Sequence, residues 1–345
     1  MASFFSLDAK RRIGDKNQLM KMSELINWGR IDYKVRRINK NLSDGKTAGV
    51  VPYDSVAMFK AILLQNWHSL SDAGLEEALN VRIDFMLFCG FDISDTIPDE
   101  TTICRFRNKL IKANLLEKLF KEINSQLEDL NFKVKKADMA IVDATIIESS
   151  CRPKSKIIEE VVEDRKEEEV KSESEFKETD SSDSDAAWIK KGKRSFFGYK
   201  SFATVDKEGF ICKTMTVPAN ESEMNKLEEM IVPCDQFLAD KGYDSKKNRD
   251  ILRSQKIKTR IMHRKSRGKA MTLWQKRFNK AVSKDRFRVE QSFGTLKRRF
   301  NFSRASYRTT IKVQAQFTLK AMCLNLLKAV NKVVLISSPP QLITG

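Results

Sequence analysis

The stretch Met139–Ile147, MAIVDATII, decides the predicted fold. Its apolar residues alternate and are rich in β-branched side chains, which is typical of a central strand in a sheet. The residues before it, 50–130, instead carry apolar side chains at helical spacing. This change of period near Lys136 predicts an all-helical N-terminal domain over residues 1–135 and an α/β domain over residues 136–335.

Helix signals are clear in the first domain. In the stretch 51–67, Val56, Phe59 and Ile62 or Leu63 follow one another at three- and four-residue spacing. Ser71 is a predicted N-cap of the next helix, and Asp99 or Thr101 opens one or two more. Residues 1–50 are expected to form short helices and loops. The first domain is therefore predicted to contain no sheet.

Strands and helices alternate after the strand at 139–147. Two strands joined by a hairpin at Asp206–Gly209 are expected first. The order that follows is a helix, a strand, a helix, a strand, a long helical region and a tail helix, at residues 221–231, 235–240, 245–255, 258–264, 272–300 and 312–335. A break of the long helical region near Lys284 stays an open alternative. This order predicts a mixed sheet with flanking helices.

Residues 155–187 interrupt this pattern. Residues 156–187 hold 13 acidic and 5 basic side chains, many serines, and almost no large apolar residues after Val162. Such a composition cannot build a core. We expect a surface insertion that is part helix and part disordered.

The charge is concentrated in the second half of the chain. The 345 residues carry a formal net charge of +18, and residues 188–345 alone hold 35 basic and 12 acidic side chains. This balance favours a polyanionic partner, although many basic proteins only keep themselves soluble. The six cysteines form no C-x-x-C pair and there are only two histidines, which argues against disulfide, zinc and histidine-based sites. Neither a signal peptide nor a membrane span is recognisable, so a soluble cytoplasmic protein without a membrane partner is expected.

Three acidic residues stand in settings that fit one active site. Asp143 lies in the middle of the strand at 139–147, and Asp240 directly follows the strand at 235–240. In the predicted order these two strands are neighbours, which would bring the carboxylates together. Carboxylates suit Mg²⁺ or Mn²⁺, and two such ions can drive phosphoryl transfer. Taken singly, an aspartate of this kind is about as often a strand-end cap or turn former.

Glu290 lies on a predicted helix rich in cations. Arg286 is four residues before it and Lys297 seven after it, so the three share one face. The helix continues with Arg298 and Arg299. A surface ion pair of little energetic value is the commoner fate of such neighbours, but it does not explain so many cations on one face.

These motifs resemble the DDE transposases of bacterial insertion sequences, in the IS-five/IS-four group and of the IS-five family type. That group shares a Y-x2-R-x3-E-x6-K signature, which this sequence matches at Arg286, Glu290 and Lys297. Ser283 replaces the tyrosine, which leaves open whatever that tyrosine does. The first-acid pattern V-D-A-T matches residues 142–145, and the second-acid pattern D-x-G-Y matches residues 240–243. With further similar stretches, the resemblance covers nearly all of residues 50–330.

The resemblance implies a ribonuclease H-like catalytic domain and two Mg²⁺ ions, for which Mn²⁺ could substitute. Asp143, Asp240 and Glu290 would be the catalytic and metal-binding residues. DNA would be bound by Arg286, Lys297, Arg298 and Arg299. The helical domain would bind the terminal inverted repeats of an element, a homodimer or larger assembly would bring two ends together, and target DNA would be the second substrate. The expected location is the bacterial cytoplasm.

Two other functions stay open at this point. A catalytically silent repressor derived from a transposase would bind DNA without cutting it, and a nuclease on the same fold would cut without joining. In the helical domain, Arg105, Arg107 and Lys109 could contact phosphate, but a solvated helix face is about as common for such residues.

Overall fold

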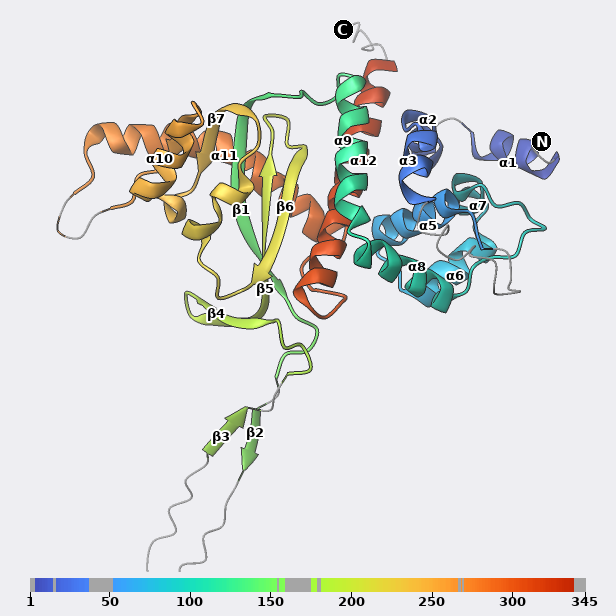
Figure 1. Cartoon of the computed structure of the whole chain (residues 1–345), viewed down its shortest axis with the longest axis horizontal. Helices are drawn as coiled ribbons and strands as arrows, with labels where there is room; N and C mark the ends of the chain where they lie inside the picture. Colours follow the sequence, from blue (N-terminus) through green and yellow to red (C-terminus); the bar gives the residue numbers. More distant parts are fainter. Residues whose placement is uncertain are drawn as a thin grey trace, which may run out of the picture.

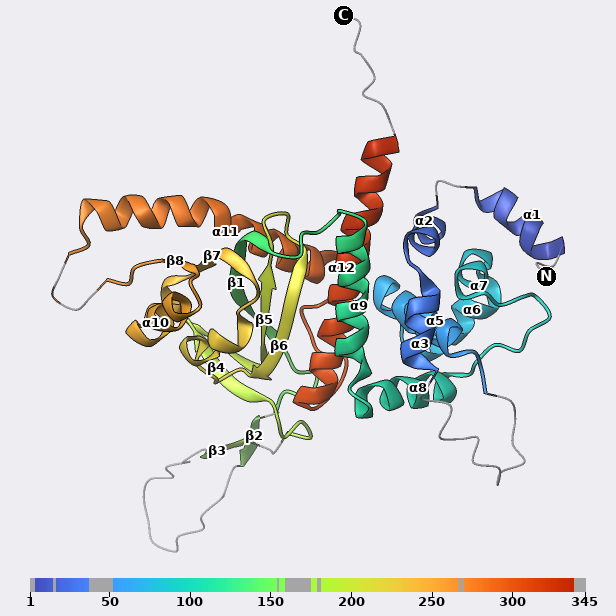
Figure 2. The same cartoon turned by 45° about the horizontal axis from the view of Figure 1, so that its top comes forward.

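The computed structural model describes residues 4–14, 17–36, 52–153, 155–158, 175–178, 181–265, 268 and 270–337. A sheet with its flanking helices occupies one end of the molecule and a group of short helices the other (Figure 1). Two long helices, α9 and α12, run side by side between these parts (Figures 1 and 2). Among the described helices, none combines the length and the apolar character that crossing a lipid bilayer requires.

The first part is all-helical, as predicted. Its helices are α1 Phe4–Ile13, α2 Gln18–Leu25, α3 Trp28–Val35, α5 Ser55–His68, α6 Asp72–Val81, α7 Ile83–Cys89, α8 Glu100–Lys112 and α9 Leu115–Asp129. The predicted caps are confirmed: the Ser71 side chain accepts a hydrogen bond from the Gly74 N–H, and Asp99 accepts one from the Thr102 N–H. Helix α5 is buried almost all round, so the other helices pack about it.

The second part is built on a mixed sheet. Its strands are β1 Ala137–Glu148, β4 Ala187–Lys191, β5 Arg194–Val205, β6 Ile211–Pro218, β7 Cys234–Ala239 and β8 Lys258–Ile261. One edge of β5 pairs antiparallel with β1, and its other edge pairs with β4 and β6. Strands β7 and β8 continue the sheet beyond β1 in parallel. The order β6-β5-β1-β7-β8 is that of the ribonuclease H-like fold, and the predicted neighbourhood of the first strand and the strand at 235–240 is confirmed.

Alternate residues of β1 enter two different cores. Ile141 and Ile147 belong to the core that contains residues of α11 Leu273–Arg299 and α12 Thr310–Ser337. Ala140 and Val142 belong to the core on the other face, beneath α10 Lys246–Ser254. Side chains at odd positions near the middle of β1 therefore point toward the face that carries α11.

Helix α12 joins the two parts of the molecule. It contacts β6 on one side and α9 and α5 on the other. One hydrophobic core accordingly runs from the short helices to the sheet. The division of the chain at residues 135/136 stays a prediction.

One local prediction is wrong, and two features were left open or not foreseen. Residues 221–231 were expected to be one helix but form two 3-10 helices, η1 Glu223–Lys226 and η2 Glu228–Met230. Leu227 and Met230, three residues apart, are both fully buried, and a 3-10 turn repeats at that spacing. Strand β4 was not foreseen, and α11 runs through Lys284 without a break.

The described parts of the acidic insertion contain strands and turns, not helix. Strand β2 Ser155–Ile158 pairs antiparallel with β3 Glu175–Glu178, away from the main sheet (Figure 1). The predicted disorder falls on residues that lie outside the described part of the chain.

Candidate active site

Asp143 and Asp240 lie at the same level on two neighbouring strands. In the parallel pair β1–β7, Ile141 stands opposite Leu238. Asp143 comes two residues after Ile141, within β1. Asp240 comes two residues after Leu238, directly after the end of β7. Because side chains two apart share a face, both carboxylates point toward the α11 side of the sheet. The predicted convergence of these two acids is therefore present.

The Arg286 side chain, from α11, bridges the two carboxylates. One guanidinium nitrogen lies 2.9 Å from an Asp143 Oδ, and the other lies 3.3 Å from an Asp240 Oδ. The remaining Asp143 oxygen accepts a hydrogen bond from the Ala144 N–H at 2.9 Å. The Arg286 side chain is 11% exposed, so this pairing is largely shielded from water. A cation therefore lies between the two carboxylates, where a metal shared by them would lie.

The electrostatics of Asp143 favour additional positive charge. Burial raises the pKa of this carboxyl to about 6, and the negative charges of Glu223 and Asp240 add to the effect. The Arg286 guanidinium and the Ala144 N–H act in the opposite direction but do not cancel it. The charged form of this carboxylate is still disfavoured although an arginine lies beside it. A divalent cation would stabilise that charged form further.

Two buried polar atoms in this region lack a hydrogen-bond partner among the described residues. They are the Nε of Arg286 and the hydroxyl of Tyr243, which is fully buried. Burial raises the pKa of the Tyr243 hydroxyl well above its ordinary value, and Glu223, Asp143 and Asp240 contribute to the rise. Buried polar atoms are rarely left unpaired in a folded protein. These two donors are therefore suited to a ligand or an ordered water at the acid pair.

Glu290 is not part of the same close group. It lies on α11 one turn after Arg286, and its side chain is exposed. No three His, Cys, Asp or Glu residues in the described part of the chain are grouped closely enough to hold a metal ion. Residues four apart share a helix face, so Glu290 lies on the side from which Arg286 reaches the aspartates. Its role as the third acid stays a prediction.

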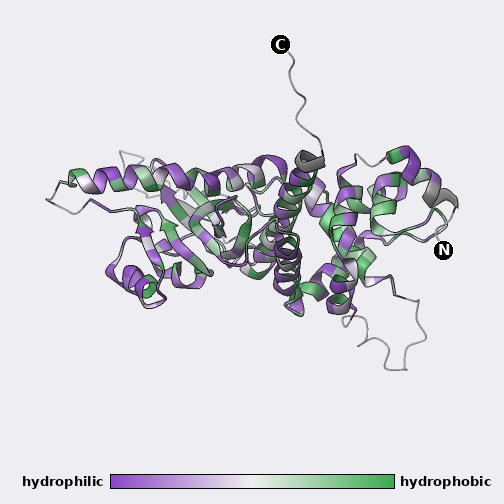
Figure 3. Cartoon of the chain, turned by 90° about the horizontal axis from the view of Figure 1, so that it is seen from above, coloured by the Kyte–Doolittle hydropathy of each residue, from purple (hydrophilic) through white to green (hydrophobic). Residues whose placement is uncertain are grey.

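Three of the four predicted DNA-binding cations lie in the last turn of α11, a helix along which hydrophilic and hydrophobic residues are mixed (Figure 3). Lys297 is half-buried, and burial together with the charge of Lys191 lowers the pKa of its ammonium group. Arg298 is exposed. Arg299 instead turns to the helical part, where it donates to the Gln18 side chain at 3.2 Å and lies over Trp67. The three cations thus face different surroundings.

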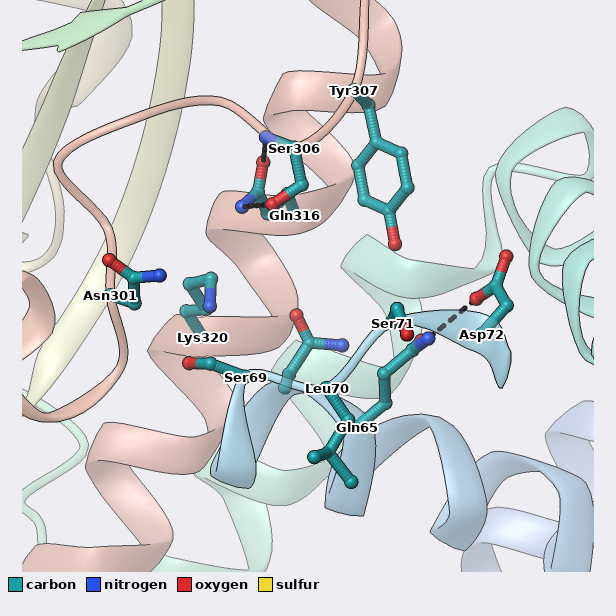
Figure 4. A pocket seen from close by; sticks show the side chains of 11 residues that line it. Gln65, Ser69, Leu70, Ser71, Asp72, Asn301, Ser306, Tyr307, Gln316 and Lys320 are labelled. Atoms are coloured by element: carbon teal, nitrogen blue, oxygen red, sulfur yellow. Dashed lines mark hydrogen bonds between the residues drawn. The ribbon is translucent and has the colours of Figure 1, made fainter. Parts of the chain in front are cut away.

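Arg107 is a structural residue. Only 3% of it is exposed, and its two terminal nitrogens lie 2.5 and 2.8 Å from the two carboxylate oxygens of Asp72. The phosphate contact considered for it does not fit this burial, whereas Arg105 and Lys109 on the same helix are exposed. Asp72 also lines a polar pocket of about 390 Å³ between the end of α5 and α12 (Figure 4). That pocket contains none of the three predicted acids.

Two further charged residues adjoin the acid pair and were not foreseen. Glu223 begins η1, and Lys200 of β5 is buried with its Nζ 3.8 Å from a Glu223 carboxylate oxygen. The sequence placed Glu223 in an ordinary helix, where a glutamate is expected to face water. The one sequence signal for a close neighbour here was Gly242, two residues after Asp240, because a glycine leaves room for another group.

Comparisons with known proteins show the family of this chain. Residues 135–326 match the family described as "Transposase DDE domain", and residues 7–109 match one described as "Transposase domain". A relative from Neisseria meningitidis serogroup B, the transposase for insertion sequence element IS1106, is 41% identical over 233 residues. That match covers 66% of this chain and 77% of the relative.

Two solved structures are distantly similar. The piggyBac transposase synaptic complex with hairpin DNA gives a TM-score of 0.48 at 10% identity, over 95% of this chain and 77% of that one. The Mos1 mariner paired end complex with Mn gives a TM-score of 0.18 at 10% identity, over 79% and 88% of the two chains. Both scores are too low to support a residue-by-residue comparison.

Proposed function

Because this chain belongs to the DDE transposase family, we propose that Asp143, Asp240 and Glu290 form its catalytic centre, which cuts DNA at the ends of an insertion sequence and joins them to a target. The observation that carries the assignment is the pairing of Asp143 and Asp240 through one guanidinium. That guanidinium belongs to Arg286, four residues before Glu290 on the same helix. The site is thus assembled from the central strands and the helix that the family signature occupies.

The residues present fit a divalent metal. The donors are carboxylate oxygens, which Mg²⁺ and Mn²⁺ prefer, and a cation already bridges them. Asp143 and Asp240 would hold the metal, with Glu290 as the third ligand. We propose Mg²⁺, two ions per site, with Mn²⁺ as a substitute. When bound, such ions activate the attacking water or 3′-hydroxyl and stabilise the leaving oxygen.

The protein side chains have separable tasks in this mechanism. Arg286 neutralises the two aspartates before the metal arrives, and it must leave at least one of them when the metal binds. Its guanidinium is then free for a phosphate oxygen, a group that arginine can bind through two hydrogen bonds. Lys297 and Arg298 lie further along α11 and extend the phosphate-binding surface. Arg299 belongs to the same proposed set, although its present contacts are within the protein.

The proposed partners are the terminal inverted repeats and a target duplex. Binding of the repeats is assigned to the helical part, and a homodimer or larger assembly would hold two ends together. The bacterial cytoplasm, where the chromosome lies, is the proposed place of action.

Replacing Asp240 with Asn tests the function. The change keeps the size of the side chain but removes a metal-binding charge, so we expect no cleavage or strand transfer in Mg²⁺ or Mn²⁺. Binding to DNA that carries the terminal repeats should be unchanged. Asp235→Asn is the matched control: it lies on the same strand, is exposed, and pairs with Lys136 at 2.5 Å.

Three results would contradict the proposal. Normal cutting by Asp240→Asn would remove the metal assignment. Binding without any cut product from the unmodified protein would favour a repressor. Cut products without joined products would favour a nuclease.

A further inference from the structure

Glu223 is tied to its surroundings by residues from a strand, a turn and a helix. Its carboxylate lies 3.8 Å from the Nζ of Lys200, which also donates to the Glu221 carbonyl oxygen at 2.7 Å. Lys200 belongs to β5, the strand that pairs with β1. It is 6% exposed, so its charge needs a close partner. The Glu223 carboxylate pairs with this charge, and the ion pair directs Glu223 toward the sheet.

The backbone after Asp240 approaches the same carboxylate. A Cβ added to Gly242 would lie 3.0 Å from an Oε of Glu223, which is tighter than an ordinary contact. The Asn248 side-chain amide donates to the carbonyl oxygens of Met224 and Tyr243, both at 2.9 Å. These bonds tie the segment that carries Glu223 to the turn that follows Asp240. The position of the glutamate relative to the acid pair is therefore set by the fold.

A separate observation indicates a ligand in this space. The buried Tyr243 hydroxyl has no hydrogen-bond partner among the described residues. Glu223, Asp143 and Asp240 all raise its pKa, so the hydroxyl lies within electrostatic range of the three acids. Glu223 also contributes to the raised pKa of Asp143. A buried donor without a partner, within electrostatic range of three carboxylates, suits an ordered ligand or water close to them.

The charges in this region do not balance. Three carboxylates, of Asp143, Asp240 and Glu223, pair with only two cations, Arg286 and Lys200. One negative charge is therefore in excess when all five groups are ionised. If Arg286 turns to DNA, the excess grows by one. A divalent cation would then be the compensating charge.

We propose that Glu223 is a further acid of the divalent-cation site, a role that rests on the proposed function. Lys200 pairs with its carboxylate, Gly242 leaves room for it, and the unpaired Tyr243 hydroxyl lies within electrostatic range of the same acids. In the present arrangement the Arg286 guanidinium fills the space between the aspartates. Glu223 therefore adds a negative charge that strengthens cation binding once Arg286 has withdrawn.

The test is Mn²⁺ binding to the full chain, followed by the electron paramagnetic resonance signal of the free ion. We expect Glu223→Gln to weaken Mn²⁺ binding by about 10- to 100-fold, the range found for residues that support metal ligands. Glu221→Gln is the matched control. It lies two residues away, is half exposed, and its carboxylate pairs with Lys226, so it should bind Mn²⁺ like the unmodified protein.

The variant Asp240→Asn separates the proposed role of Glu223 from the proposed catalytic site. If it loses Mn²⁺ binding while Glu223→Gln retains it, the role of Glu223 is refuted and the catalytic site stands. If neither variant changes Mn²⁺ binding, the proposed site itself fails. Should Glu223→Gln not fold, Gly242→Ala tests the same idea, because its methyl group displaces the carboxylate. A several-fold loss of Mn²⁺ affinity supports the proposal, and an unchanged affinity overturns it.

Discussion

Replacing Asp143 with Asn should remove a loss of stability that the unmodified protein suffers as the pH rises toward neutral. In the folded state the pKa of this carboxyl is about 6, against an ordinary value of 3.8. The folded state therefore binds the proton more tightly than the unfolded state does. Stability from this group is complete below pH 3.8 and falls as pH rises through 6. Asparagine does not titrate, so the variant escapes this loss.

The size of the effect follows from the two pKa values. A difference of about two pKa units corresponds to about 3 kcal/mol, since each unit is about 1.4 kcal/mol. This is an upper value, because the Asp143 side chain keeps 20% exposure. The stability of Asp143→Asn relative to the unmodified protein should therefore rise by up to about 3 kcal/mol between pH 4 and pH 7.

Urea unfolding at a series of pH values measures this difference. Other titrating groups are common to both proteins and cancel in the comparison. Asp138→Asn is the control: it lies on the same strand, but its side chain is 75% exposed to water. A difference for Asp143→Asn that does not change with pH would refute the reasoning. Mg²⁺ should also stabilise the unmodified protein, by about 2.7 kcal/mol at a hundred times its Kd, but not the variant.

Three further outcomes are expected. Arg286→Ala removes the cation that lowers the pKa of Asp143, so the pH-dependent loss of stability should move above pH 6 in the same unfolding series. A pH profile of stability that does not move would contradict the ion pair between Arg286 and Asp143. Asp183→Asn should cost about 2–3 kcal/mol in urea unfolding, because this buried carboxylate accepts bonds from Ser149, Tyr199 and the Thr309 N–H. A loss below about 0.5 kcal/mol would be contrary evidence. Lys297→Ala should weaken DNA binding and reduce its salt slope by about 1 if the lysine contacts a phosphate, and an unchanged slope would exclude the contact.

The convergence of the two aspartates was predictable from the sequence. The two positions follow from the order of the strands and from the two-residue repeat of side chains along a strand. Neighbouring parallel strands end at one edge of the sheet, and residues two apart share a face. The bridge through Arg286 was not predictable. It joins residues 143 positions apart and depends on how α11 lies across the sheet and on one side-chain conformation.

The errors have similar physical causes. Strand β4 is short, lies at an edge of the sheet, and consists of three apolar residues followed by two lysines, so it lacks the apolar alternation that reveals a strand. Glu223 was missed because its segment has a plausible helical pattern. The segment instead forms two 3-10 helices, with Leu227 and Met230 buried at the spacing at which a 3-10 turn repeats. Tertiary packing overrode local propensity there.

The central claim is that Asp143 and Asp240 share a divalent cation. Anomalous diffraction from crystals grown with Mn²⁺ and an uncleaved terminal-repeat duplex tests it most directly. We predict an anomalous peak within coordination distance of both carboxylates, with Arg286 turned away from at least one of them. Well-ordered crystals at saturating Mn²⁺ that show the guanidinium still bridging the aspartates, and no peak between them, would contradict the account.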